Sequence, residues 1–191
     1  MLNLLGIEMK VLALVGSPRK NGNTDILVDK LLEGASSENC SVEKLYLYDM
    51  DIQPCVDCRN CTKKSFECSI EDDMKMLYSK LEEADVLIFG TPLYWYGPSA
   101  KMKLVMDRLL PYSTLNKLRG KKAVLIVPSE EGDAASKHLV GMFELSFRYL
   151  EIQLVNTLLV KAYTKGEVKE QPDTLEKILT IGRSLAKSCA L

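Results

Sequence analysis

Five short apolar runs, rich in branched side chains, alternate with segments of helical periodicity, and this alternation strongly limits the possible folds. The runs cover residues 10–16, 42–48, 85–90, 122–128 and 152–160. Three of them are nearly continuous in apolar residues, as expected for strands buried on both faces of a parallel sheet. Helices are predicted at 24–32, 73–81, 100–110, 137–149 and 174–186. This order predicts an α/β fold, doubly wound, with helices on both faces of the sheet.

The whole chain, residues 1–191, is predicted to form one domain, because no repeat, low-complexity tract or linker divides it. The 25 basic and 26 acidic residues nearly cancel, which argues against nucleic acid or an anionic membrane as partner. No stretch reaches the roughly 18 uncharged apolar residues of a membrane helix. The apolar N-terminus lacks the basic flank and cleavage site of a signal peptide. We therefore expect a cytoplasmic protein with no nucleic-acid and no membrane partner.

The loop GSPRKNGNT (16–24) connects the first predicted strand to the first helix. In sheets of this type, ligands bind beyond the carboxyl ends of the strands, and a helix N-terminus with free N–H groups binds anions. Asn23 or Thr24 is expected to cap the helix. The loop matches neither the dinucleotide-binding nor the nucleotide triphosphatase pattern. A monophosphate is the expected ligand, with an ordinary polar turn as the alternative.

The loop TPLYWYGPS (91–99) follows the third predicted strand and carries three adjacent aromatic residues, Tyr94, Trp95 and Tyr96. Three neighbours in one loop cannot all point into a core. They suit a flat ligand with an apolar body, or the surface of a neighbouring subunit. Ser99 is expected to cap the helix that follows.

The loop at about 49–71, after the second predicted strand, holds four of the six cysteines: Cys55, Cys58, Cys61 and Cys68. Structural disulfides are not expected in a reducing cytoplasm. Three cysteines at consecutive two-residue intervals resemble the ligands of a [4Fe–4S] cluster, and Arg59, Lys63 and Lys64 would offset its charge. A zinc site and free or oxidised thiols are the alternatives. Cys40 and Cys189 stand alone and are expected to be ordinary thiols.

These three motifs, in this order, resemble the iron–sulfur flavoproteins of the flavodoxin-like NAD(P)H-dependent FMN reductase family, and the resemblance covers nearly the whole chain. It implies a five-stranded parallel sheet of order 2-1-3-4-5, non-covalent FMN, and a [4Fe–4S] cluster held by the four cysteines of the loop. It further implies that the FMN phosphate is bound by Ser17, Arg19, Asn21, Asn23 and Thr24. The flavin ring would lie along Pro92, Leu93, Tyr94, Trp95, Tyr96 and Gly97. The segment from Ser129 to Gly132 would close the pocket, although Glu130 and Glu131 stand where small residues are expected.

The resemblance implies an oxidoreductase that passes electrons from ferredoxin or NAD(P)H to an acceptor, and a homodimer or homotetramer. A cluster-free NAD(P)H-dependent FMN or quinone reductase is one alternative. A passive FMN-binding electron carrier and a zinc-stapled binding module are others. In the order 2-1-3-4-5 the second strand lies at the rim, so the cysteine loop and the flavin are expected to be far apart within one chain, and a neighbouring subunit would bring them together.

No catalytic side chain is predicted. His138 is the only histidine and is expected to open the helix at 137–149 without a catalytic role. The acidic residues 71–73 are expected to begin the second helix, where negative charge is favourable.

Overall fold

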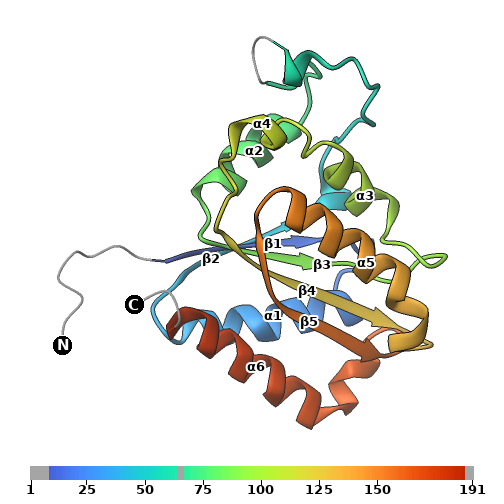
Figure 1. Cartoon of the computed structure of the whole chain (residues 1–191). Helices are drawn as coiled ribbons and strands as arrows, with labels where there is room; N and C mark the ends of the chain where they lie inside the picture. The colour runs from blue at the N-terminus through green and yellow to red at the C-terminus, as the bar shows by residue number, and fades with distance from the viewer. Residues whose placement is uncertain (1–8, 64–66, 188–191) are drawn as a thin grey trace, which may run out of the picture.

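Five parallel strands form one sheet in the order β2-β1-β3-β4-β5 in the computed structural model, which describes residues 9–63 and 67–187 (Figure 1). The strands are β1 (Lys10–Val15), β2 (Ser41–Tyr46), β3 (Val86–Gly90), β4 (Lys122–Ser129) and β5 (Gln153–Lys161). The predicted α/β fold and strand order are therefore confirmed. Strand β2 ends two residues earlier than predicted, because the chain turns into the 3-10 helix η1 (Leu47–Asp49).

Helices cover both faces of the sheet. Helices α1 (Asn23–Ser36) and α6 (Pro172–Lys187) lie below it in Figure 1, and the face above carries α2 (Met74–Glu83), α3 (Ala100–Asp107), α4 (Tyr112–Leu115) and α5 (Asp133–Tyr149). Two more 3-10 helices are η2 (Asn60–Thr62) and η3 (Glu167–Glu170). Helix α5 begins at Asp133, earlier than predicted, so His138 lies inside the helix and does not open it.

The strands divide their side chains between two apolar layers because successive residues of a strand point to opposite faces. Leu12 and Leu14 of β1 join the layer under α2, α3 and α5, whereas Val11, Ala13 and Val15 join the layer over α1 and α6. Phe89 is central to the first layer. Its ring centroid lies 5.8 Å from that of Phe143 and 4.9 Å from that of Phe147. This two-sided burial fixes the register that places the loops.

Helices α1 and α6 cross at two glycines, Gly34 and Gly182. A Cβ atom added to Gly34 would lie 2.1 Å from the carbonyl oxygen of Leu179, and one added to Gly182 would lie 2.2 Å from that of Leu31. Real side chains do not tolerate such distances. Only glycine therefore allows these two helix backbones to pack so closely.

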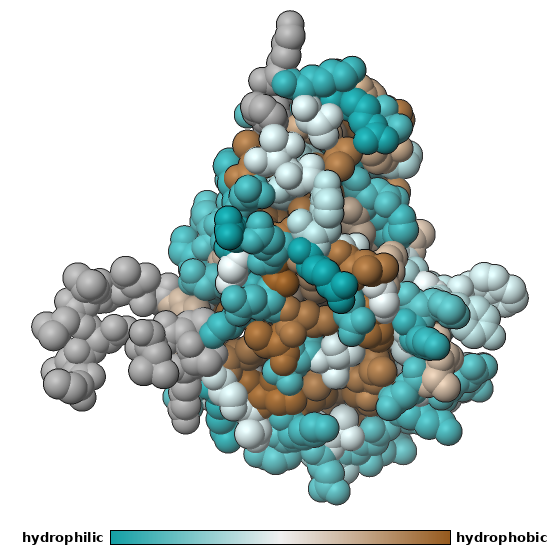
Figure 2. Space-filling model, viewed as in Figure 1, coloured by the Kyte–Doolittle hydropathy of each residue, from teal (hydrophilic) through white to brown (hydrophobic). Residues whose placement is uncertain are grey.

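The surface drawn in Figure 2 carries apolar residues over the part of the molecule where Figure 1 shows α5 and β5. Leu145 and Tyr149 of α5 are exposed to 65% and 70%, and Val155 of the edge strand β5 is also exposed. No helix within the described residues is both long enough and apolar enough to span a membrane.

Candidate functional site

The phosphate loop, residues 16–24, leaves β1 at the carboxyl edge of the sheet and leads into α1. The N-cap of α1 is Gly22, with no hydrogen bond from a side chain, so the prediction that Asn23 or Thr24 caps this helix is wrong. The side chain of Asn23 bonds instead to the segment after β5. Its Nδ2 donates to the carbonyl oxygen of Thr164 (2.8 Å), and its Oδ1 accepts from the amide of Val168 (3.4 Å). The amides of the first turn of α1 are thus not taken by a capping side chain.

Asp25, which the sequence analysis did not single out, holds the turn of this loop. Its buried carboxylate accepts the amide of Asn21 at 2.6 Å, the ammonium of Lys44 at 2.9 Å and the hydroxyl of Tyr46 at 2.9 Å. Asn21 is thereby fixed in the left-handed region, with φ 58°. Burial raises the pKa of Asp25, but the bonds from Lys44, Asn21 and Tyr46 outweigh it and leave this pKa below the usual value. The ionised carboxylate therefore acts as a structural anchor.

A cleft of about 210 Å³ opens at the same edge of the sheet. It brings together eight of the predicted FMN-binding residues: Ser17, Arg19, Asn23, Thr24, Pro92, Leu93, Tyr94 and Ser129. Four predicted residues lie outside its lining: Asn21, Trp95, Tyr96 and Gly97. Glu130, from the segment expected to close the pocket, also lines it. Five further residues line it without having been predicted as FMN-binding: Gly22, Pro128, Ala162, Tyr163 and Lys165. Four segments that are far apart in the sequence, within 17–24, 92–94, 128–130 and 162–165, therefore form one concave site.

The turn after β5 adds a second cation to this cleft. The carboxylate of Glu167 accepts the amides of Tyr163 and Thr164, both at 2.8 Å, and Asn23 ties the same turn to the phosphate loop. Lys165 sits in this turn, lines the cleft, and forms no ion pair with any residue that the structure describes. Together with Arg19 it gives the cleft two positive side chains, which suits a phosphate group. Glu130 contributes one negative charge to the lining.

The aromatic loop forms a tight hairpin. Tyr94 and Gly97 exchange both backbone hydrogen bonds, at 2.8 and 3.0 Å, and the two residues between them, Trp95 and Tyr96, have φ of 48° and 62°. Two consecutive aromatic residues in the left-handed region are strained, and such strain is typical of functional loops. Trp95 is 94% exposed at the tip. The base of the loop is rigid, since Ser99 caps α3 by accepting from the amide of Met102 at 3.3 Å, as predicted.

The cysteine loop projects beyond α2 and α3 and stands apart from the aromatic loop (Figure 1). Cys55 and Cys58 are exposed, Cys68 is half-buried and Cys61 is buried. Burial raises the pKa of Cys61, and the charges of Cys68, Cys55 and Cys58 act in the same direction. Four thiols form a donor set that fits an iron–sulfur cluster or zinc. Nevertheless, no three Cys, His, Asp or Glu side chains in 9–63 and 67–187 converge on a possible metal position. Lys64 and Cys189 lie outside the described residues.

The two ends of the cysteine loop, residues 51–53 and 72–73, are joined by hydrogen bonds, and we call this part of the structure the neck of the loop. The amide of Asp51 donates to the carboxylate of Asp73 at 2.7 Å, and the amide of Asp73 donates to the carbonyl oxygen of Asp51 at 3.0 Å. Asp72 accepts the amide of Gln53 at 2.8 Å and both terminal nitrogens of Arg108 at 2.7 and 3.0 Å. Asp72 also accepts the amide of Met74 at 3.0 Å, so the acidic residues do stand at the start of α2 as predicted. The buried ion pair of Asp72 with Arg108 was not predicted.

This ion pair perturbs both of its members. Burial raises the pKa of Asp72, but the bonds from Arg108, Gln53 and Met74 lower it by more and leave it below the usual value. Burial lowers the pKa of Arg108, whereas Asp72 raises it, and the net shift is upward. Both groups are thus held in their charged forms.

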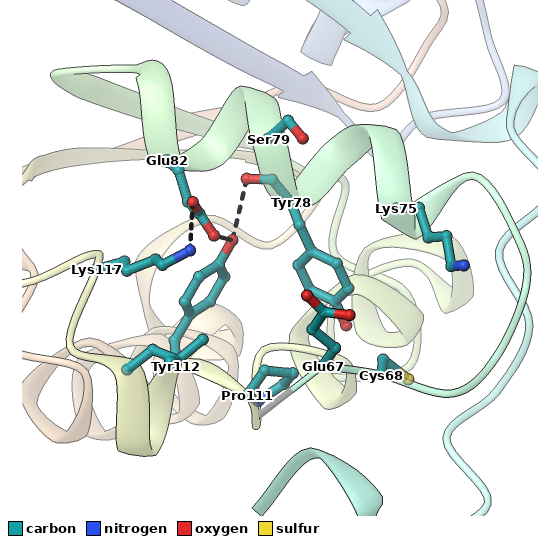
Figure 3. A pocket seen from close by; sticks show the side chains of 10 residues that line it. Glu67, Cys68, Lys75, Tyr78, Ser79, Glu82, Pro111, Tyr112 and Lys117 are labelled. Atoms are coloured by element: carbon teal, nitrogen blue, oxygen red, sulfur yellow. Dashed lines mark hydrogen bonds and ion pairs between the residues drawn. The ribbon is translucent and has the colours of Figure 1, made fainter. Parts of the chain in front are cut away.

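A second cavity, of about 390 Å³, lies beside Cys68 between α2 and α4 (Figure 3). Its polar groups bond mainly to one another. The hydroxyl of Tyr112 donates to the carbonyl oxygen of Tyr78 at 3.0 Å, and Lys117 pairs with Glu82 at 2.8 Å. The hydroxyl of Tyr78 donates to the carbonyl oxygen of Arg108 at 2.6 Å. These groups are engaged with one another and with the backbone, so the cleft at the carboxyl edge of the sheet remains the better candidate site.

The chain is similar to several known proteins. An iron–sulfur flavoprotein of Methanocaldococcus jannaschii is 39% identical over 120 residues, which cover 61% of this chain and 62% of that protein. An iron–sulfur flavoprotein of Archaeoglobus fulgidus is 37% identical over 119 residues, covering 62% of this chain and 54% of that protein. The chain therefore spans less than two thirds of the length of these relatives.

The structure resembles the NAD(P)H:quinone oxidoreductase from Methanothermobacter marburgensis, with a TM-score of 0.72 and 21% identity over 94% of this chain and 100% of that one. This similarity supports the flavodoxin-like fold. The sequence pattern of the NADPH-dependent FMN reductases matches residues 9–162, which include every strand of the sheet and the phosphate, cysteine and aromatic loops. The chain belongs to the NADPH-dependent FMN reductase family.

Proposed function

We propose that this protein is an FMN-dependent oxidoreductase that passes electrons between a reduced donor, ferredoxin or NAD(P)H, and an acceptor through FMN and a [4Fe–4S] cluster. The observation that carries the flavin part is the cleft at the carboxyl edge of the sheet. It combines an anion-binding loop with the wall formed by Pro92, Leu93 and Tyr94. Bound FMN would supply both one-electron and two-electron chemistry, which links the two kinds of redox partner.

The residues of the cleft divide into two groups by chemistry. Arg19 and Lys165 would neutralise the phosphate, while the buried hydroxyls of Ser17 and Thr24 and the first-turn amides of α1 would donate hydrogen bonds to it. The wall from Pro92 to Tyr94 offers apolar surface for the ring. The fit is supported by Gly22, where an added Cβ would lie only 2.8 Å from the carbonyl oxygen of Arg19, so this tight turn requires glycine.

The cluster part rests on the cysteines. Cys55, Cys58, Cys61 and Cys68 would be its ligands, and the similarity to two iron–sulfur flavoproteins supports an iron–sulfur centre. The cysteine loop and the aromatic loop stand apart in Figure 1. We therefore propose a homodimer or homotetramer in which electrons cross between subunits, and the exposed apolar residues Leu145 and Tyr149 of α5 support such an assembly. Light scattering of the purified protein measures its mass directly.

Anaerobic purification followed by flavin, iron and sulfide assays tests the proposal. We expect one FMN and about four irons per chain. Cys58→Ala should lose the iron and keep the FMN, because the two sites share no residue. Cys40→Ala, which changes a cysteine outside the loop, is the matched control and should keep both. Protein without flavin would refute the assignment of the cleft.

A cluster-free NAD(P)H-dependent FMN or quinone reductase is the second candidate. It is favoured by the absence of three converging metal ligands among the described residues and by the family to which the chain belongs. Flavin without iron after reconstitution, together with steady NAD(P)H oxidation, would establish it. Flavin that is reduced by ferredoxin and not by NAD(P)H would instead point to an electron carrier, and zinc without flavin to a binding module.

A further inference from the structure

The neck of the cysteine loop is closed by side chains that come from three separate parts of the sequence. Residues 51–53 and 72–73 are joined by the reciprocal bonds of Asp51 and Asp73 and by the bond from Gln53 to Asp72. Helix α3 and the residue that caps it hold the first of these segments from the other side. Lys101 donates to the carbonyl oxygen of Met50 at 2.7 Å, and Arg108 donates to that of Gln53 at 2.9 Å.

Arg108 is the centre of this arrangement. Its side chain is 1% exposed and that of Asp72 is 0% exposed, and the two form a bidentate pair. Its Nε is also buried and has no hydrogen-bond partner among the described residues. A buried ion pair of this kind is weak evidence for stability, because removing both charges from water is costly. Its value is geometric, since a planar guanidinium fixes the two groups that it binds.

We propose that Arg108 and Asp72 are positioning residues that hold the neck of the cysteine loop closed before any metal binds, so that the segment carrying Cys55, Cys58, Cys61 and Cys68 begins and ends at one fixed place. This inference rests on the proposed iron–sulfur function. Joining the ends of a flexible loop costs entropy. Because the hydrogen bonds of the neck already hold the two ends together in the folded protein, cluster binding does not have to offset this loss of loop-closure entropy.

The position of Cys68 agrees with this role. It lines the same cavity as Tyr78 (Figure 3). The hydroxyl of Tyr78 donates to the carbonyl oxygen of Arg108 at 2.6 Å. Tyr78 therefore connects the cavity beside Cys68 to the residue that closes the neck.

Hydrogen exchange on the iron-free, full-length protein tests the closed neck without any substitution. The amides of Asp51, Gln53 and Asp73 should exchange at least tenfold more slowly than those of residues 56–59 at the outer part of the loop. Equal exchange at the two places would overturn the proposal. This measurement is independent of whether the protein takes up iron.

Iron release to a chelator from the reconstituted protein tests the consequence for the cluster. Arg108→Gln should release iron at least tenfold faster than the unchanged protein and keep its FMN, whereas Arg108→Lys should lie between the two, because it keeps the charge and loses the fork. Lys103→Gln removes an exposed charge from the same helix and should behave like the unchanged protein. A folded Arg108→Gln protein with normal iron content and release rate would overturn the proposal.

The two failures are distinguishable. If Arg108→Gln does not fold, the exchange of the neck amides in the unchanged protein decides the question. If the unchanged protein takes up no iron at all, the iron–sulfur function is refuted, and the proposed role of the neck in metal binding falls with it even where its amides are protected.

Discussion

Replacing Gly182 with alanine should destabilise the protein, although alanine is the better helix former. The new Cβ would lie 2.2 Å from the carbonyl oxygen of Leu31 and 3.0 Å from the amide nitrogen of Ala35. An ordinary contact begins at 3.4 Å, so α1 and α6 would have to move about 1.2 Å apart at this point. A carbonyl inside a helix cannot rotate away to relieve the contact, because its direction is fixed by the helix.

The magnitude follows from two opposing effects. Overpacking of this kind costs about 3 kcal/mol at the upper end of its usual range, while exchanging glycine for alanine in a helix gains about 1 kcal/mol. We expect a net loss of about 2 kcal/mol, which lowers the melting temperature of a chain of this size by about 4–8 °C.

Gly141→Ala is the matched control. Gly141 lies inside α5, and an added Cβ there meets nothing within 4 Å. This variant should be more stable by up to about 1 kcal/mol. Thermal and urea unfolding, followed by circular dichroism, would measure both variants. If Gly182→Ala proved as stable as Gly141→Ala, the close crossing of α1 and α6 would be refuted.

Two further predictions concern the charged groups. Lys165→Gln should weaken FMN binding about threefold to tenfold while leaving riboflavin binding unchanged, because only FMN carries the phosphate. Lys169→Gln, which removes an exposed charge outside the cleft, is the control. Fluorescence titration with both flavins measures the two affinities. Equal losses for the two flavins would contradict a phosphate contact. The pKa values of Asp25 and Asp72 lie below the usual value of 3.8, so the stability that their ionised forms contribute is complete above about pH 4 and is lost as the pH falls through the lowered values. The urea midpoint of the unchanged protein should therefore be level from pH 7 to pH 5 and fall below pH 4. Asp72→Asn should be less stable by about 3 kcal/mol at pH 7, and its midpoint should fall less steeply at low pH. A parallel fall of the two midpoints would contradict the role of this carboxylate.

Much of the fold was predictable because its signals are local. The apolar runs of the five strands, the spacing of the helices and the cap at Ser99 each depend on residues that are near one another in the sequence. The strand order followed from the family resemblance. Boundaries were less certain, as at the start of α5, where no capping side chain marks the first turn.

The candidate site was predictable only in part. The phosphate loop and Pro92, Leu93 and Tyr94 were found because their motifs are continuous in the sequence. Asn23 was expected to serve the helix that it begins, yet it bonds to the turn after β5, which is 141 residues away at Thr164. The residues next to Asn23 in the sequence do not indicate that its side-chain amide bonds to a backbone group so far along the chain.

The sequence by itself determined the class of fold, the loops that bear the site and the cysteines that could hold a metal, because periodicity and motif spacing are properties of neighbouring residues. Only the tertiary structure decided which charges meet. Asp25 with Lys44 and Asp72 with Arg108 are separated by 19 and 36 residues. Such partners are selected when the sheet forms and burial makes an unpaired charge too costly, and that selection requires the folded chain.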